Sequence, residues 1–148
     1  AIAVLDGGTF EVKWGVQGLT SRQHDPDFLS NGKIMLFDNS YRSAISRVVT
    51  YSLDRIGPVW QYTAPDFYSR TRGSQQPLPN GNVLITESNA GTLLEVDREG
   101  RVVWKYQSPH QADKIFGGGK FIGVVLWGHR YPKEYFTERF RVDVENGG

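Results

Sequence analysis

Histidine and arginine are the residue types in this sequence that could carry out chemistry. The three histidines are His24, His110 and His129, and the absence of cysteine excludes thiolate metal sites and cysteine nucleophiles. A histidine exchanges a proton near neutral pH and can also act as a nucleophile. An arginine binds an oxyanion through its planar fork of N–H groups. What these side chains can do together depends on where the fold places them.

His24 lies in the first copy of an internal repeat. The stretch SRQHDPDFLSNGKIMLFDN, 21–39, is matched by RGSQQPLPNGNVLITES, 72–88, when their Asn-Gly pairs are superposed. His24 then falls where the second copy has Gly73. A site grafted on a repeated framework produces such a difference, and so does neutral drift.

A second landmark repeats at a shorter spacing. VWQY at 59–62 matches VWKY at 103–106, which places an insertion in the first copy at 39–46, NSYRSAIS. We expect this insertion to be a loop. Arg42 lies within it.

Each copy of the repeat predicts four short strands separated by turns. The Asn-Gly pairs favour hairpin turns because both residues tolerate positive φ. A four-stranded unit of roughly 40–50 residues has the period of a β-propeller blade, so we predict an all-β fold, a partial propeller of four-stranded antiparallel blades. We expect Trp60 and Trp104 to be buried in equivalent positions between blades. The predicted strands cover 27–29, 33–38, 47–52 and 58–62 in the first copy and 76–78, 82–87, 92–97 and 101–106 in the second.

The repeat divides the chain into too few blades to form a closed propeller. A propeller has at least about four blades, and this sequence predicts about two full ones. We therefore expect another polypeptide to complete the propeller, either the rest of a cleaved parent chain or further copies of this one. Apolar side chains on the outer faces would otherwise be bare, namely Ile34, Leu36, Leu84 and Leu93. The parts are 1–20, the end of a preceding blade with a final strand in GTFEVKWGVQG; 21–64, a blade; 65–109, a blade; and 110–148, a partial last blade and tail.

Composition excludes several classes of function. The net charge of +1 gives no indication of nucleic-acid binding or of a polybasic membrane patch. No run of about eighteen apolar residues predicts a membrane span. No oxygen-rich loop predicts a metal site, and FGGGKF at 116–121 lacks the context of a phosphate-binding loop, so we read it as a hairpin turn or a close packing site. The chain begins at Ala1, so either a signal peptide has been removed or the sequence is a piece of a longer chain.

Several phrases together resemble the arylsulfotransferase family of β-propellers. They are HDPDFLSNGKIMLFDN, DFYSRTRGSQQPLPNGNVLITES, LLEVDREGRVVWKY and RYPKEYF, and the resemblance covers about 23–136. It would place the chain in the C-terminal half of a family member. It implies transfer of a sulfuryl group from an aryl sulfate to a phenolic acceptor through a sulfated histidine, with no nucleotide donor and no cofactor. It also implies a secreted protein, extracellular or periplasmic.

The resemblance assigns roles to particular residues. His24 would face the central channel and help to bind and protonate the sulfate ester, and Arg42 would bind the sulfate. Arg70 and Arg72 could form a second anion site near the channel. For each of these residues a purely structural role is the alternative. His24 could bond through its ring to the backbone of a turn, and the arginines could be solvated or paired with carboxylates on the rim.

The sequence departs from the family pattern at the nucleophile. The family's nucleophilic histidine falls in the region VLITESNAG, 83–91, which has no histidine here, and neither His110 nor His129 matches it. Three alternatives remain open. His24 is the nucleophile, another residue is, or the protein is a non-catalytic secreted propeller that acts as a binding or structural assembly module.

Overall fold

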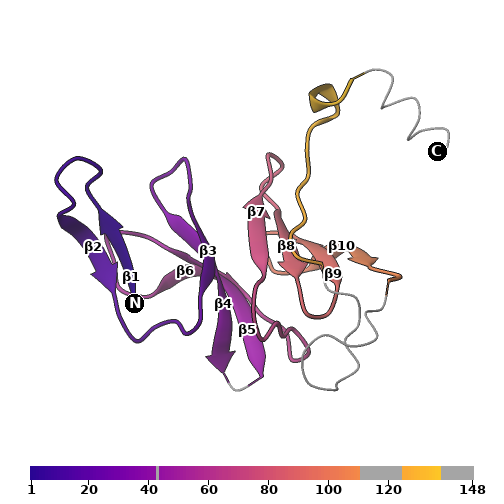
Figure 1. The fold of residues 1–148 in the computed structure, drawn as a ribbon, viewed down its shortest axis with the longest axis horizontal. Coiled ribbons are helices and arrows are strands. Elements are labelled where there is room, and N and C mark those ends of the chain that lie inside the picture. The colour runs from indigo at the N-terminus through magenta and orange to yellow at the C-terminus, as the bar shows by residue number, and fades with distance from the viewer. Residues whose placement is uncertain (43, 111–124, 138–148) are drawn as a thin grey trace.

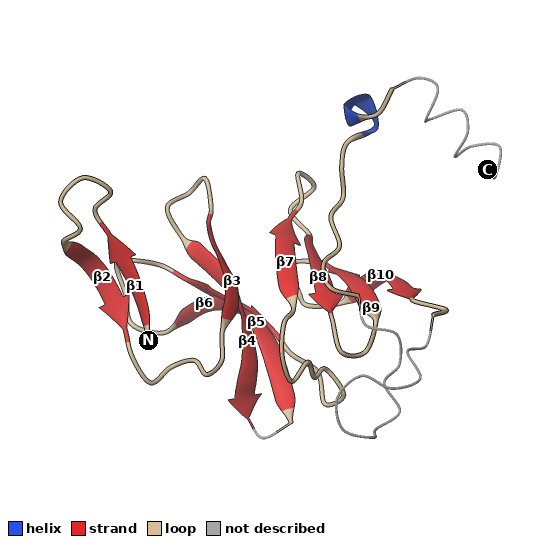
Figure 2. Cartoon of the chain, viewed as in Figure 1, coloured by secondary structure: helices blue, strands red, loops and turns tan. Residues whose placement is uncertain are grey.

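The chain folds into short antiparallel strands followed by one turn of 3₁₀ helix (Figures 1 and 2). The computed structural model describes residues 1–42, 44–110 and 125–137. The elements are β1 (Ile2–Leu5), β2 (Val12–Val16), β3 (His24–Phe28), β4 (Ile34–Arg42), β5 (Ile45–Tyr51), β6 (Pro58–Tyr62), β7 (Ser74–Pro77), β8 (Val83–Glu87), β9 (Thr92–Val96), β10 (Val102–Gln107) and η1 (Lys133–Tyr135).

The strands form two four-stranded sheets and one hairpin. One sheet has the order β3-β4-β5-β6, the other has the order β10-β9-β8-β7, and β1 pairs with β2. All neighbouring strands are antiparallel. The all-β prediction is confirmed, and each sheet has the meander order of a propeller blade. The part of the chain that the structure describes contains no closed ring of blades.

The main hydrophobic core lies between the two four-stranded sheets. Phe67, in the segment that joins the sheets, packs against Phe37 and Tyr62 with ring centroids 5.5 and 5.2 Å apart. Face-to-face packing of this kind is what neighbouring blades require. The core comprises Met35, Phe37, Val48, Tyr62 and Phe67 with Val83, Ile85, Leu94 and Val96.

The outer face of the first sheet is covered by the N-terminal hairpin. Ile2, Val4 and Trp14 of the hairpin pack against a second apolar cluster on β4 and β5. Ile34 and Leu36 are therefore only 4% and 0% exposed, and the prediction that they would be bare was wrong. The prediction failed because it expected one strand, within 8–18, and missed β1, which precedes that strand and pairs with it to form a hairpin.

The outer face of the second sheet is covered by residues 125–130. Gly128 donates its backbone N–H to Thr86 and lies so close to Leu93 that a Cβ would overlap that side chain. Figure 1 shows this segment passing β7 and β8 on its way to η1. Leu84 is 3% exposed as a result, and Leu93 is half-buried, so the prediction that this face would be bare was also wrong.

The two repeated tryptophans occupy corresponding strands but different environments. Trp60 on β6 is half-buried and donates its indole N–H to the carbonyl of Arg98, in the turn between β9 and β10, at 2.9 Å. Trp104 on β10 is 43% exposed and stacks on Tyr106. The prediction that both would be buried was wrong: Trp60 is half-buried, and Trp104 is exposed because among the described residues no further sheet packs against β10.

The insertion at 39–46 lengthens a hairpin. β4 runs to Arg42, and Arg42 pairs with Ile45 at the start of β5, so most of the predicted loop is strand. β3 and β7 also begin earlier than predicted, at His24 and Ser74. No helix in the described part of the chain is long and apolar enough to cross a membrane. The predicted turn at 116–121 lies outside the described residues.

Candidate functional site

His24 opens β3, the first strand of the first sheet. Its Nδ1 lies 2.9 Å from the backbone carbonyl of Arg22 and 2.6 Å from Oδ1 of Asn39. The rest of the side chain is exposed. The contact with the Arg22 carbonyl is the bond to turn backbone that the ordinary reading of His24 expected. The contact with Asn39 goes beyond that reading, because Asn39 lies on the neighbouring strand.

Asn39 is a fully buried side chain that ties three segments together. Its Nδ2 donates to the carbonyl of Ser69 at 2.9 Å and to the carbonyl of Arg72. Since Nδ2 has two carbonyl acceptors, Oδ1 is the atom that faces His24. Asn39 therefore holds the start of β3 against the segment 69–72, which leads from the first sheet into the second.

These contacts fix which nitrogen of His24 carries the proton. Both neighbours of Nδ1 are acceptor oxygens, so Nδ1 must be the protonated donor. In the neutral ring Nε2 then has a free lone pair, and it belongs to the exposed part of the residue. An imidazole held in this tautomer can accept a proton or attack an electrophile through Nε2.

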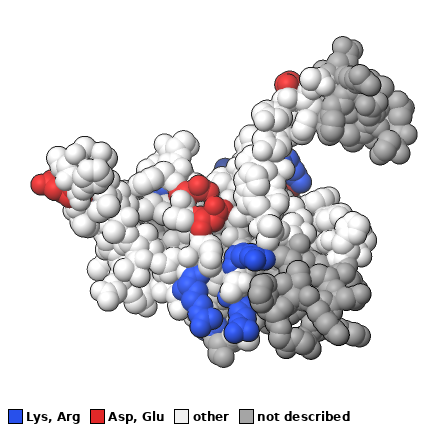
Figure 3. Space-filling model, viewed as in Figure 1, with Lys and Arg blue, Asp and Glu red and all other residues white. Residues whose placement is uncertain are grey.

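Four exposed arginines lie on the chain segments that meet near this histidine. Arg22 and Arg72 supply backbone carbonyls to the His24–Asn39 pair, Arg70 lies between the two Asn39 acceptors, and Arg42 follows Asn39 on β4. No carboxylate lies within ion-pairing distance of any of the four in the described part of the chain. Figure 3 shows basic side chains gathered at the end of the molecule where the β4–β5 hairpin turns.

The tip of the β4–β5 hairpin is held by a buried ion pair. Arg47 on β5 contacts Asp38 on β4 at 2.9 Å, and both side chains are buried. The Arg47 guanidinium lies 4.0 Å from the ring centroid of Tyr41, and that of Arg42 lies 5.1 Å from the same centroid. Asp38 also accepts the backbone N–H of Ser21, which positions the approach to His24.

Asp25 connects the same strand to the second sheet. Its carboxylate accepts the backbone N–H of Gln75 on β7 at 3.2 Å, and the Gln75 side chain donates to its carbonyl. Burial raises the pKa of the Asp25 carboxyl; the Gln75 N–H lowers it, and the charge of Asp27 raises it. Asp25 adopts φ 54° in the bulge of β3 that follows His24, and its contacts with Gln75 hold this conformation.

Gly73, the counterpart of His24, has a structural role of its own. It has φ 106°, and a Cβ there would lie 2.7 Å from the ring of Phe37 in the main core. A side chain is therefore excluded at this position of the second sheet. The second copy needs glycine at this position because the Phe37 ring leaves no room for a side chain. Neutral drift alone therefore does not explain why the two copies differ here.

Sequence reasoning missed Asn39 and Arg22. The signal for Asn39 was the contrast between FDN in the first copy and TES in the second, which replaces a long amide with Ser88. The predicted residues His24, Arg70 and Arg72 lie on segments that Asn39 joins directly, and Arg42 lies three residues further along β4. The other two histidines, His110 and His129, lie on other segments.

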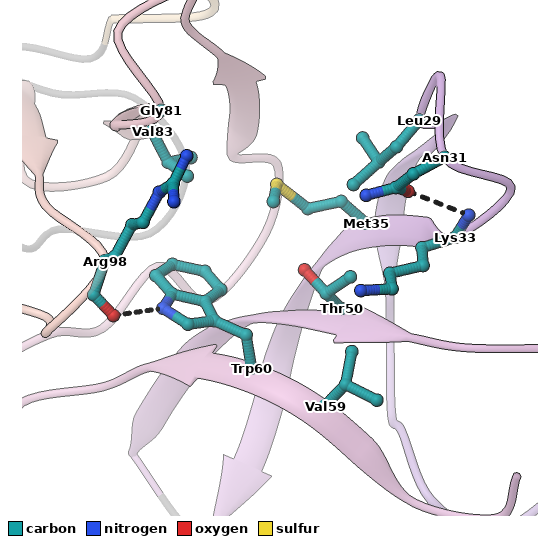
Figure 4. A pocket seen from close by; sticks show the side chains of 10 residues that line it. All are labelled: Leu29, Asn31, Lys33, Met35, Thr50, Val59, Trp60, Gly81, Val83 and Arg98. Atoms are coloured by element: carbon teal, nitrogen blue, oxygen red, sulfur yellow. Dashed lines mark hydrogen bonds between the residues drawn. The ribbon is translucent and has the colours of Figure 1, made fainter.

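Two pockets lie away from His24. One, of about 180 Å³, opens between the sheets at the opposite end of β3 (Figure 4). Another, of about 460 Å³, lies beside β7, under residues 129–132. Neither is lined by His24 or by the four arginines. The described residues contain no group of three or more His, Cys, Asp or Glu side chains that could hold a metal ion.

Comparison with known proteins gives one match. The model of the arylsulfotransferase (ASST) family matches residues 1–109, which include both four-stranded sheets and the His24 region. No curated protein and no solved structure matches the chain.

Proposed function

The chain belongs to the arylsulfotransferase family, and on that basis we propose that it transfers a sulfuryl group from an aryl sulfate to a phenol through His24. The observation that carries the proposal is the bonding of the His24 ring. Its protonated Nδ1 is directed at Asn39 and the Arg22 carbonyl, which leaves Nε2 with a free lone pair on an exposed residue.

The first step is attack of Nε2 on the sulfur of the donor. A bond forms between Nε2 and sulfur, the bond between sulfur and the phenolic oxygen breaks, and the donor leaves as a phenolate. The ring becomes a cationic N-sulfo imidazolium with its proton still on Nδ1. Asn39 Oδ1 and the Arg22 carbonyl accept hydrogen bonds from the Nδ1–H group, and these bonds stabilise the positive ring.

The second step returns the ring to its starting state. The oxygen of the acceptor phenol attacks sulfur, the sulfur–Nε2 bond breaks, and the acceptor's proton passes to solvent. The positive charge on the ring makes Nε2 a good leaving group. The same tautomer thus serves both steps, with Nε2 alternately free and sulfated.

The arginines supply the charge that sulfate transfer needs. An aryl sulfate has one negative charge spread over its nonbridging oxygens, and a guanidinium binds two of them in one plane. Arg42, Arg70 and Arg72 are the residues we assign to this role, with Arg22 as an addition. Tyr41 holds the Arg42 guanidinium against its ring, which limits the conformations that Arg42 must give up on binding.

The experiment is transfer from 4-nitrophenyl sulfate to phenol by the protein in its complete assembly. We expect His24→Ala to reduce turnover at least about a hundredfold, and removal of any one binding arginine to reduce it by roughly tenfold or more. His129→Ala is the matched control and should leave turnover unchanged. Equal turnover by wild type and His24→Ala would reject His24 as the nucleophile.

The proposal extends to partners and location. We propose that another polypeptide, a cleaved parent's remainder or further copies, completes the propeller beside β10, where Val102, Val103 and Trp104 are exposed. We also place the protein outside the cell or in the periplasm, as is general for this family. No cofactor takes part in the mechanism we propose.

A non-catalytic role is the second candidate. The observation that favours it is the lack of a histidine in 83–91, where the family has its nucleophile. In that case the chain would be a binding or structural assembly module. Absence of turnover in the wild-type assembly, with the fold intact, would support this candidate over the first.

A further inference from the structure

The pocket between the two sheets lies at the other end of the strands from His24. β3 starts at His24 and ends at Phe28, and the pocket begins with Leu29 and Asn31 in the turn that follows. It is closed on the far side by Gly81 and Val83 of the second sheet. The pocket is therefore separate from the site proposed for sulfuryl transfer, and the inference below does not depend on that proposal.

Three side chains in a row across the first sheet form its floor. Met35 pairs with Thr50, and Thr50 pairs with Trp60, so the three side chains point to the same face. The Trp60 ring is held by its 2.9 Å bond to the Arg98 carbonyl. A thioether and an indole side by side make a flat apolar surface that suits a ring or another planar group.

Thr50 adds an unused polar group to this floor. The residue is 4% exposed, and its hydroxyl oxygen is buried with no hydrogen-bond partner among the described residues. Figure 4 shows the hydroxyl directed into the space beside Met35 and Trp60. A buried hydroxyl without a partner is unfavourable by about 1–3 kcal/mol, so a ligand that bonds to it gains affinity.

Two cations lie at opposite sides of the pocket. Figure 4 shows Lys33 on one side, with Asn31, and Arg98 on the other, with Trp60 between them. Neither cation has a carboxylate within 4.0 Å in the part of the chain that the structure describes. The Arg98 guanidinium lies against Gly81, where a Cβ would be 2.7 Å from its Nη2. The pocket thus combines an apolar floor, one free hydroxyl and two positive charges that form no close ion pair among the described residues.

From these features we propose that this pocket binds a small organic anion with a flat apolar body, of the aromatic carboxylate class. The body lies on Trp60 and Met35, the carboxylate bonds to Lys33 or Arg98, and the Thr50 hydroxyl donates to it. The volume of about 180 Å³ is below the roughly 300–1,000 Å³ of sites for drug-sized ligands, which limits the ligand to about one ring.

The test is titration of the full chain with benzoate, followed through the indole N–H resonance of Trp60 by NMR. The resonance of Trp60 is identified as the one that disappears in the Trp60→Phe variant. We expect saturable shifts with a Kd of about 1 mM, and weaker binding of the neutral benzyl alcohol by about tenfold. Lys33→Met and Arg98→Met should each weaken benzoate binding, whereas Lys13→Met, on the N-terminal hairpin, should not.

Thr50→Val separates the hydroxyl from the shape of the pocket. This substitution keeps the volume, and we expect it to weaken benzoate binding severalfold while leaving benzyl alcohol less affected. The proposal is overturned if benzoate gives no saturable shift. It is equally overturned if benzoate and benzyl alcohol bind alike, or if both cation variants bind benzoate as well as the wild type does.

Discussion

Glu87 and Asp38 occupy the same position in the two copies of the repeat, yet their surroundings differ. Asp38 has the buried guanidinium of Arg47 at 2.9 Å. Glu87 is 7% exposed, and its carboxylate accepts the backbone N–H of Tyr68 at 2.8 Å. Burial raises the pKa of the Glu87 carboxyl, the Tyr68 N–H lowers it, and the charge of Asp66 raises it, for a net increase.

This increase predicts a pH dependence of stability. Because the folded protein holds the Glu87 proton more tightly than the unfolded chain does, stability falls as the pH rises from the ordinary glutamate range through the raised pKa. Glu87→Gln removes the charge and keeps an acceptor for Tyr68. We expect it to raise the melting temperature at pH 8 and to have little effect at pH 4. Equal melting-temperature differences at both pH values would contradict this account.

Gly73 predicts a packing effect that a second glycine can isolate. Gly73→Ala places a Cβ against the Phe37 ring at positive φ, so we expect a loss of about 1–2 kcal/mol from the backbone and about 1–3 kcal/mol from the overlap. Gly32→Ala is the control, because Gly32 has φ 76° with nothing within 4 Å of the added Cβ. Urea denaturation measures both. If the two variants lose the same stability, Phe37 does not exclude a side chain.

At the scale of elements, Asn39 joins β3, β4 and the segment 69–72. Asn39→Ala removes its bonds to His24, Ser69 and Arg72 and takes a donor from two carbonyls, so we expect a loss of about 2–3 kcal/mol. Trypsin should also cleave faster after Arg70 and Arg72. Asn31→Ala is the control, since that side chain bonds to the exposed Lys33 backbone at 3.2 Å. Unchanged cleavage in Asn39→Ala would refute the connecting role.

The blades themselves were predictable from the sequence. The repeated Asn-Gly turns and apolar runs gave the antiparallel order of β3–β6 and β7–β10, since a meander with short turns leaves few alternatives. The path of 125–130 across the second sheet was not predictable. It depends on long-range contacts, such as that between Gly128 and Thr86, that have no local pattern.

The site was predictable only in part. His24 and the arginines were recognised by their chemistry and by resemblance. The tautomer of His24 could not be predicted, because it is set by the contact with Asn39. Asn39 makes that contact only because the fold buries its side chain between three segments. A buried amide and an exposed one look the same in a sequence.

At the scale of the whole molecule, β10 is the most exposed strand. Every residue of β10 is exposed, and Trp104 and Tyr106 stack in parallel on it. We expect the chain to associate through this strand, and Trp104→Glu to weaken association. Tyr135→Glu, at a side chain 67% exposed on η1, is the control. Mass measurement in native buffer checks this, and a stable wild-type species of 16.7 kDa with no partner would contradict it.

The central claim is that His24 carries the sulfuryl group between donor and acceptor. The most direct measurement is incubation of the chain with ³⁵S-labelled 4-nitrophenyl sulfate without acceptor, followed by quenching in alkali and mapping of the labelled peptide. We predict label on the peptide that contains His24, loss of that label when phenol is added, and no label in His24→Ala. Label on His110 or His129, or labelling of His24→Ala equal to wild type, would contradict the account.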